Sequence, residues 1–153
     1  MKLLTKNFGE IEYEEKDIIY FKDGLPGFLQ DKKFVLIIED PESPFTWLQS
    51  VDHKDLAFVL TQPTLFYKDY EPSVKDELME QLGDIKDGDL QVYAVVVVPE
   101  DITKMSVNLR APIIIHTKNK KAMQVIVDNE EYKVKHYIYE ELISKKDNEK
   151  VGE

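Results

Sequence analysis

Short apolar segments separated by turn residues recur along the whole chain. Runs rich in Val, Ile, Phe and Tyr alternate with clusters of Gly, Pro and Asp, a pattern typical of many short β-strands. Apolar and polar residues alternate most clearly over residues 45–51, whereas 95–98 and 113–115 are continuously apolar and are predicted to be buried on both faces. The pattern predicts a closed or two-layered sheet, with strands at residues 2–5, 18–21, 34–39, 46–50, 57–61, 90–98, 106–112, 113–116, 123–127 and 136–139.

One segment departs from this β pattern. Val74, Leu78 and Leu82 recur every four residues, which is the spacing of an amphipathic helix. Pro72 suits a first helical position, and Gly83 is placed to end the helix. We expect one short helix here, or two if residues 139–145 also coil.

Length and composition predict one domain. The chain has 153 residues, of which 42% are hydrophobic, and it shows no repeat at a fixed period and no low-complexity linker. Residues 144–153 are polar and mixed in charge, so they are expected to form a mobile tail after a domain at residues 1–143. The predicted fold is mainly β, a single-domain antiparallel β-barrel-like fold with one or two short helices.

Acidic side chains outnumber basic ones, 30 to 20, which gives a formal net charge of −10. The average field of such a surface repels a phosphate backbone, so we expect no direct nucleic-acid partner. An oligonucleotide-binding barrel would need a basic groove, and the strongest basic cluster, residues 118–121, lies on a predicted hairpin tip.

Several features that would place the protein elsewhere in the cell are missing from the sequence. There is no cysteine for disulfides or thiolate metal sites. The longest purely apolar run, residues 93–98, is far shorter than the ~20 residues of a membrane span, and residues 1–10 lack the apolar core of a signal peptide. We therefore expect a cytoplasmic protein with no membrane contact, monomeric when free.

Candidate catalytic groups are few. His53, His116 and His136 form no pair with the spacing of metal ligands, so neither a metal nor a cofactor is expected. Ser50, Asp52 and His53 lie close together in sequence, and their convergence in a pocket would make a small β-barrel enzyme or small-molecule sensor. The alternative is a strand end followed by a polar turn, and no Gly-x-Ser-x-Gly elbow is present. We expect no enzymatic activity.

Two segments carry more apolar mass than a plain turn requires. Residues 23–28 combine Leu25 and Phe28 with a proline and two glycines, and these side chains could either plug a barrel end or meet a partner. Residues 65–71 place three aromatic side chains beside acidic ones, a mixture that both interfaces and cores use.

A set of short segments, none specific alone, follows one order and spacing through the chain. The segments are Phe21 with Gly24-Leu25-Pro26-Gly27-Phe28, Pro44-Phe45, Leu48-Gln49-Ser50, Ala57-Phe58-Val59-Leu60 with Pro63, Tyr70, Asn108-Leu109-Arg110-Ala111-Pro112-Ile113, and Gln124. In the order and spacing of these segments the chain resembles the family of the flagellar assembly factor FliW, over residues 8–139.

The resemblance implies a small cytoplasmic β-barrel-like protein with two protein partners. Members of this family bind newly made flagellin and, when flagellin is exported, bind the RNA-binding translational repressor CsrA instead. They antagonise CsrA allosterically, away from its RNA-binding surface, and so relieve repression of flagellin mRNA. The acidic net charge suits a basic partner such as an RNA-binding protein.

Two sets of residues are predicted to contact these partners. The set for CsrA joins acidic and apolar residues in loops that one barrel rim could bring together: Tyr70, Glu71, Asp101, Ile102, Asn108 and Leu109. The set for flagellin was chosen for apolar mass beyond what turns require: Leu25, Pro26, Phe28 and Phe66.

Overall fold

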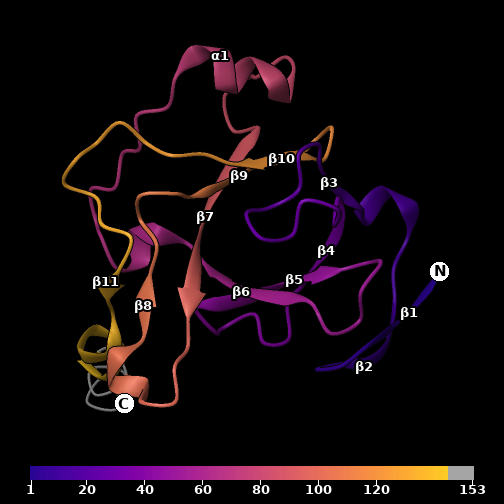
Figure 1. Cartoon of the computed structure of the whole chain (residues 1–153), viewed down its shortest axis with the longest axis horizontal. Coiled ribbons are helices and arrows are strands. Elements are labelled where there is room, and N and C mark those ends of the chain that lie inside the picture. The colour runs from indigo at the N-terminus through magenta and orange to yellow at the C-terminus, as the bar shows by residue number, and fades with distance from the viewer. Residues whose placement is uncertain (145–153) are drawn as a thin grey trace.

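The computed structural model of the chain describes residues 1–144, and the tail predicted at residues 144–153 lies, from residue 145 on, outside the described residues. A seven-strand ring forms the centre of the molecule (Figure 1). Around the ring the strands are β7 (Leu90–Val97), β6 (Ala57–Thr61), β5 (Phe45–Ser50), β4 (Lys33–Ile37), β3 (Ile19–Phe21), β10 (Lys121–Gln124) and β9 (Ile113–His116), and β9 pairs back onto β7. The predicted mainly β barrel is confirmed.

The long strand β7 closes the ring. Residues 94–96 pair with β6, while residues 90–93 pair with β9 on the opposite edge. All pairs in the ring are antiparallel except β10 with β3, where Lys121 lies opposite Tyr20 in a parallel register. No tight turn can join two parallel strands, and about a hundred residues of chain separate these two.

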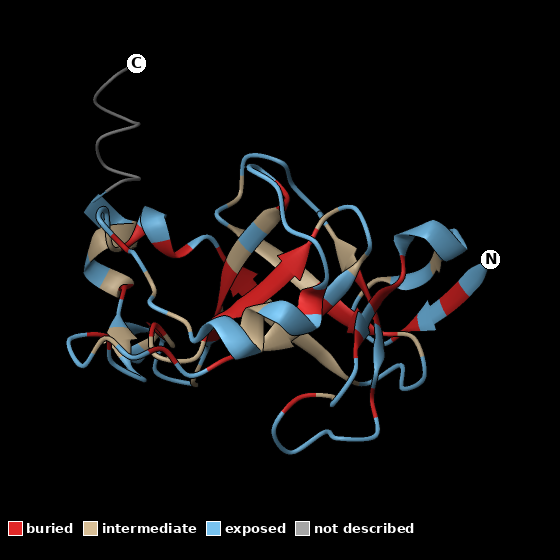
Figure 2. Cartoon of the chain, turned by 90° about the horizontal axis from the view of Figure 1, so that it is seen from above, coloured by how far each residue is buried: buried red, intermediate tan, exposed pale blue. Residues whose placement is uncertain are grey.

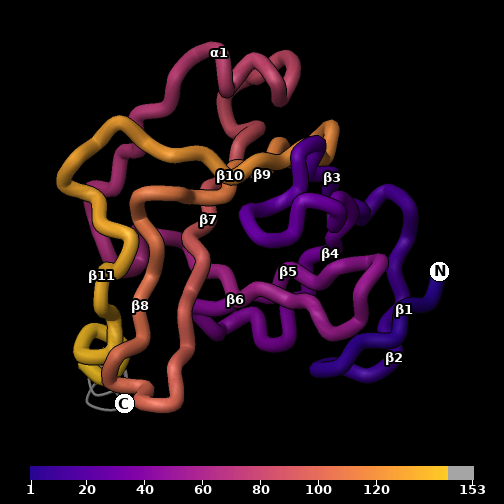
Figure 3. The backbone as a smooth tube through the Cα atoms, viewed as in Figure 1, coloured from indigo at the N-terminus to yellow at the C-terminus, as the bar shows by residue number. Residues whose placement is uncertain are grey.

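Two further strands continue the sheet beyond the ring. β8 (Ser106–Val107) pairs with the end of β7, and β11 (His136–Tyr137) pairs with β8. Figure 3 shows the three running side by side. The predicted strand at residues 106–112 ends at Val107, because the Asn108 side chain accepts hydrogen bonds from the amides of Arg110 and Ala111 and turns the chain.

A separate hairpin covers the other side of the barrel. β1 (Lys2–Thr5) pairs with β2 (Gly9–Glu12), a strand with one apolar residue that the hydrophobic pattern did not reveal. Leu3 of this hairpin packs with Ile18 and Val35, so the hairpin is anchored to the outside of β4.

The barrel interior holds the main core. Its fully buried members are Phe21, Phe34, Leu48, Leu60 and Ile113, none of which exposes any surface. In Figure 2 the buried residues concentrate in the strands that cross the centre of the molecule. Alternation along each strand directs these side chains inward.

The predicted helix is shorter than its pattern indicated. α1 (Asp76–Met79) continues into η3 (Glu80–Leu82), and Pro72 is not its first residue. The chain before it stays extended because the Ser73 amide donates to Asn129 Oδ1 at 2.6 Å and the Ser73 carbonyl accepts from the Asp128 amide at 2.9 Å. Short 3₁₀ turns lie at η1 (Glu15–Asp17), η2 (Pro63–Leu65) and η4 (Ile102–Lys104), and residues 139–144 form the second predicted helix.

Candidate functional site

The loop at residues 23–28 is a tight turn built on glycine and proline. The Phe28 amide donates to the Leu25 carbonyl at 2.7 Å, with Pro26 and Gly27 at the turn centre. Gly27 has φ +83°, which a type II turn requires at that position. Gly24 has φ +66°, and a Cβ there would lie 2.7 Å from backbone atoms of Phe28 and Leu29. Both glycines are therefore required by the shape of the loop.

This turn directs its two large apolar side chains to opposite environments. Leu25 is 3% exposed and belongs to the barrel core, so it does plug the barrel end. Phe28 packs edge-on against Phe58 at 5.5 Å between ring centres, yet 40% of it is exposed. Pro26 is exposed, and so is Leu29, which sequence reasoning missed. The turn and the residue that follows it thus leave Pro26, Phe28 and Leu29 exposed on one surface segment.

Phe66, the fourth predicted flagellin residue, lies in a different part of the core. It is 5% exposed and packs in a cluster with Tyr70, Leu109 and Tyr132, apart from the cluster that contains Leu25. The structure therefore does not bring Phe66 together with the loop at residues 23–28.

Four of the six residues predicted for CsrA meet around this tyrosine-rich cluster. Tyr70 is buried, and its hydroxyl donates to the Leu109 carbonyl at 2.6 Å. Burial, with a smaller effect of Tyr132, raises the pKa of Tyr70 far above its usual range, so the hydroxyl remains a donor. The Glu71 amide donates to the Tyr132 hydroxyl at 2.7 Å, while its side chain is exposed, and Asn108 follows β8. The buried Tyr70 and Leu109 thus lie directly next to Glu71 and Asn108 in the chain and fix the positions of these two residues.

The other two residues, Asp101 and Ile102, lie at the tip of the β7–β8 hairpin. Asp101 is exposed, and its carboxylate accepts from the Thr103 amide at 3.1 Å, which caps η4. Ile102 is 51% exposed. Neither side chain is held in the core, so both are open to solvent.

Three further apolar residues beside this tip were missed by sequence reasoning. The prediction that residues 95–98 are buried on both faces was wrong for Val97 and Val98, which are 50% and 53% exposed, because β7 runs past the closed ring. Val97 lies opposite Ser106, which lies opposite Tyr137, so the three share one face of the sheet. We call the following set the hairpin-tip surface: Val97, Val98, Glu100, Asp101, Ile102 and Tyr137.

Ser50 and His53 do meet, but through a carboxylate other than Asp52. Asp31, which is 6% exposed, accepts from the Ser50 hydroxyl at 3.3 Å and from Nδ1 of His53. The Ser50 hydroxyl in turn accepts from the His53 amide at 3.1 Å. Asp52 is exposed on the turn. In a catalytic triad the serine hydroxyl donates to the imidazole, but here it donates to the carboxylate. The cluster therefore lacks the hydrogen-bond sequence of a triad, and it fixes the turn after β5.

His53 provides a pH-dependent readout of this cluster. Its hydrogen bond to Asp31, followed by the charge of Asp31, raises the pKa of His53 above its ordinary value of 6.5. A pKa that is higher in the folded state means that protonated His53 stabilises the fold. This contribution should be fully present below pH 6.5 and should disappear as pH rises through the folded-state pKa.

The prediction is tested by comparing urea unfolding of the wild type and His53→Gln across this range, with an NMR titration of the ring. The stability difference should be largest at acid pH and should shrink as pH rises. A ring pKa at or below 6.5 would contradict the assigned hydrogen bond.

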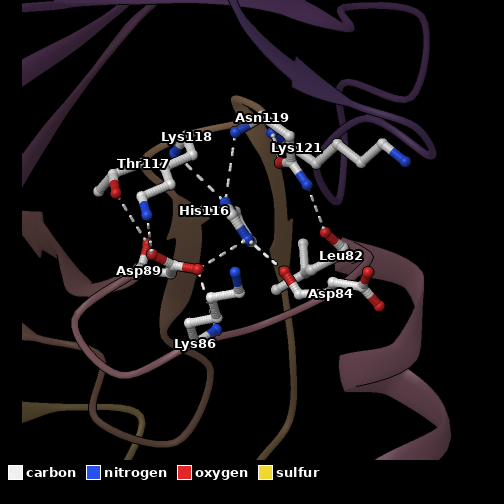
Figure 4. A network of polar contacts seen from close by, with 9 residues as sticks. All are labelled: Leu82, Asp84, Lys86, Asp89, His116, Thr117, Lys118, Asn119 and Lys121. Carbon is white, nitrogen blue, oxygen red and sulfur yellow. Dashed lines mark hydrogen bonds and ion pairs between the residues drawn. The ribbon is translucent and has the colours of Figure 1, made fainter.

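A buried histidine, His116, ties the helical region to the β9–β10 turn (Figure 4). His116 is 3% exposed, and its Nδ1 accepts from the amides of Lys118 and Asn119, both at 3.3 Å. The proton therefore lies on Nε2, which donates to the Asp84 carbonyl at 2.8 Å and lies 3.6 Å from Asp89 Oδ2. This ring connects two segments that are distant in sequence.

The Asp89 carboxylate completes this network, because it pairs with Lys118 beside the His116 ring (Figure 4). The Lys86 amide donates to it at 2.9 Å, and this bond is the first cause that lowers the pKa of Asp89; Lys118 also lowers it. Lys118 Nζ lies 3.4 Å from Asp89 Oδ1. Part of the basic cluster at residues 118–121 is thus neutralised locally, which weakens the nucleic-acid hypothesis further.

Two properties of the described residues bear on other functions. Within residues 1–144, no group of three or more His, Asp or Glu side chains is placed to hold a metal ion. Across the same part of the chain, no helix has the length and apolar character needed to cross a membrane.

Comparison with known proteins gives one consistent result. The sequence model of the FliW protein family matches residues 2–138. The flagellar assembly factor FliW of Alkaliphilus metalliredigens is 50% identical over 144 residues, which cover 93% of this chain and 88% of that protein. The flagellar assembly factor FliW of Thermoanaerobacter pseudethanolicus is 46% identical over 143 residues, which cover 93% and 95%. A crystal structure of the flagellar assembly factor FliW is 40% identical and superposes with a TM-score of 0.83, covering 91% of this chain and 97% of that one.

Proposed function

The chain belongs to the FliW family of flagellar assembly factors, and on that basis we propose that it binds flagellin in the cytoplasm and, once flagellin is exported, binds CsrA and antagonises it. Repression of flagellin mRNA is then relieved, so that flagellin synthesis follows filament assembly. The observation that carries the CsrA half of this proposal is the hairpin-tip surface, where half-exposed apolar side chains adjoin carboxylates on a chain of net charge −10. A basic, partly apolar face of an RNA-binding protein complements such a surface.

In this proposal the CsrA residues have two different roles. Asp101, Ile102 and the Glu71 side chain are exposed and would contact the repressor directly. Tyr70 and Leu109 are buried and joined by a hydrogen bond, so they would hold the surface in place, together with the turn at Asn108. Partner contact thus falls on exposed groups, and the buried ones set their positions.

For flagellin, the proposed contact is the loop at residues 23–28. Pro26 and Phe28 supply exposed apolar surface, and Leu29 extends it. Leu25 anchors the loop in the barrel core, and Phe66 supports the tyrosine-rich cluster from inside. A rigid turn that displays apolar groups suits the capture of an aggregation-prone segment before export, because little ordering entropy is lost on binding.

The proposed exchange is tested by titration calorimetry with the CsrA and the flagellin of the same organism. CsrA should form a complex with the purified protein, and an excess of flagellin should dissolve it. A ternary complex in which both partners stay bound would refute the exchange. Binding of neither partner would refute the whole proposal.

A double variant of the hairpin-tip surface, Val98→Ser with Ile102→Ser, should weaken CsrA binding about 30-fold, since two apolar side chains at the centre of an interface lose their burial. The matched control is Leu4→Ser with Ile38→Ser, because these side chains are exposed to a similar degree, 58% and 65%, and lie away from the hairpin tip, in β1 and just after β4. Calorimetry at one salt concentration measures both. Equal affinities of variant and control would remove the hairpin tip from the interface.

A further inference from the structure

The outer face of β10 carries a groove beside α1. Lys121 and Met123 point outward, because they alternate with Ala122, which is buried in the barrel core. Leu78 and Leu82 of the helical segment pack in one cluster with Met123 and cover part of this face. Figure 1 shows α1 lying beyond β9 and β10. A groove of about 810 Å³ remains between the helical segment, β10 and the turn that follows β3.

The groove offers apolar surface that the helical segment leaves uncovered. Tyr20 lies opposite Lys121 in the parallel register and is 41% exposed. Ile126, just after β10, is 69% exposed. Both line the groove together with Leu78 and Met123. A second apolar segment packed beside α1 would bury this surface and extend the layer that the helix begins.

The groove also has the opposite charge balance from the chain as a whole. It is lined by three lysines and two aspartates, whereas the chain has 20 basic and 30 acidic residues. The lysines Lys22, Lys75 and Lys121 are all exposed. Within residues 1–144 the ion pairs of lysine involve Lys2, Lys16 and Lys118, and none involves these three. Carboxylates on an occupant would therefore meet cations that the protein itself does not neutralise.

We propose that this groove receives a segment of flagellin in which carboxylates adjoin apolar side chains. The inference rests on the proposed flagellin binding, and it adds a second surface and the chemistry of the segment bound there. Gly24 lines the groove and belongs to the loop at residues 23–28, so the two surfaces are continuous. A small anion would engage the lysines but leave the apolar lining open to water, whereas a peptide segment covers both.

The test compares two charge-reversal variants that change net charge equally. The groove variant is Lys22→Glu with Lys121→Glu. The control variant is Lys6→Glu with Lys54→Glu, which changes two exposed lysines outside the groove whose backbones share a hydrogen bond. Calorimetry with cognate flagellin monomer should show about tenfold weaker binding for the groove variant at low salt, with a difference that shrinks at high salt. Tyr20→Ala should weaken binding about fivefold, with little dependence on salt, because it removes apolar contact.

Each result decides between stated alternatives. No binding of flagellin to the wild type would overturn the proposed function and this inference with it. Wild-type binding that the groove variants retain would overturn the inference alone. Inorganic phosphate that perturbs the NMR signals of the groove lysines, without competing with flagellin at constant ionic strength, would reassign the groove to small anions. Circular dichroism of each variant verifies that the fold is intact.

Discussion

Replacing Gly24 by alanine should destabilise the fold by about 3 kcal/mol, the combined effect of a non-glycine residue at positive φ and of overpacking against backbone. Gly24 has φ +66°, and an added Cβ would lie 2.7 Å from the Leu29 Cα, the Leu29 carbonyl oxygen and the Phe28 carbonyl oxygen. All three are backbone atoms, so no side-chain rotation can relieve the overlap. The backbone must therefore shift, and this shift disturbs the packing of the adjacent Leu25 in the barrel core.

Gly27 is the matched control for this change. It lies in the same loop at φ +83°, but an added Cβ there would have no atom within 4 Å. Gly27→Ala should therefore cost only about 1 kcal/mol, the conformational part of the penalty. Urea unfolding of the three proteins measures both values. Equal losses for the two variants would show that the loop shifts freely and that the close approach at Gly24 is unimportant.

Replacing His116 by alanine should cost a similar amount, about 3 kcal/mol, since it leaves a void and removes the partners of buried backbone groups. The ring is 3% exposed and accepts from the amides of Lys118 and Asn119 while donating to the Asp84 carbonyl. Alanine can replace none of these bonds. The loss should appear in the β9–β10 turn and in the segment after α1, where amide hydrogen exchange should accelerate.

His136→Ala is the control for His116→Ala. His136 is only partly buried. Its Nε2 lies 3.3 Å from the Phe66 carbonyl and 3.8 Å from the Glu141 carboxylate, and its ring makes an edge contact with Tyr67. Its replacement should cost about 1 kcal/mol. Chemical unfolding at neutral pH compares the two variants. A smaller loss for His116 than for His136 would contradict the role assigned to the buried ring.

The sites were predicted less completely than the fold. The composition of the loops directed attention to residues 23–28 and to Asp101 and Ile102, and the structure exposes Pro26, Phe28, Asp101 and Ile102. The same reasoning chose Phe66, Tyr70 and Leu109, whose side chains are buried. Aromatic and apolar residues suit both cores and interfaces, so residue type alone does not distinguish the two.

Local patterns in the sequence were sufficient to locate most strands, the barrel class, the helix near residue 80 and the acidic charge, because side-chain periodicity and turn preferences act over a few neighbouring residues. The contacts between distant residues could be read only from the folded chain. Asp31 contacts His53, which is 22 positions away in the sequence. Asn129 binds the Ser73 amide from 56 positions away and keeps that segment extended, so the helix begins only at Asp76. Likewise, Val97 and Val98 are exposed because the chain at the end of β7 extends beyond the closed ring. Their exposure depends on how the whole sheet closes, which the local sequence does not specify.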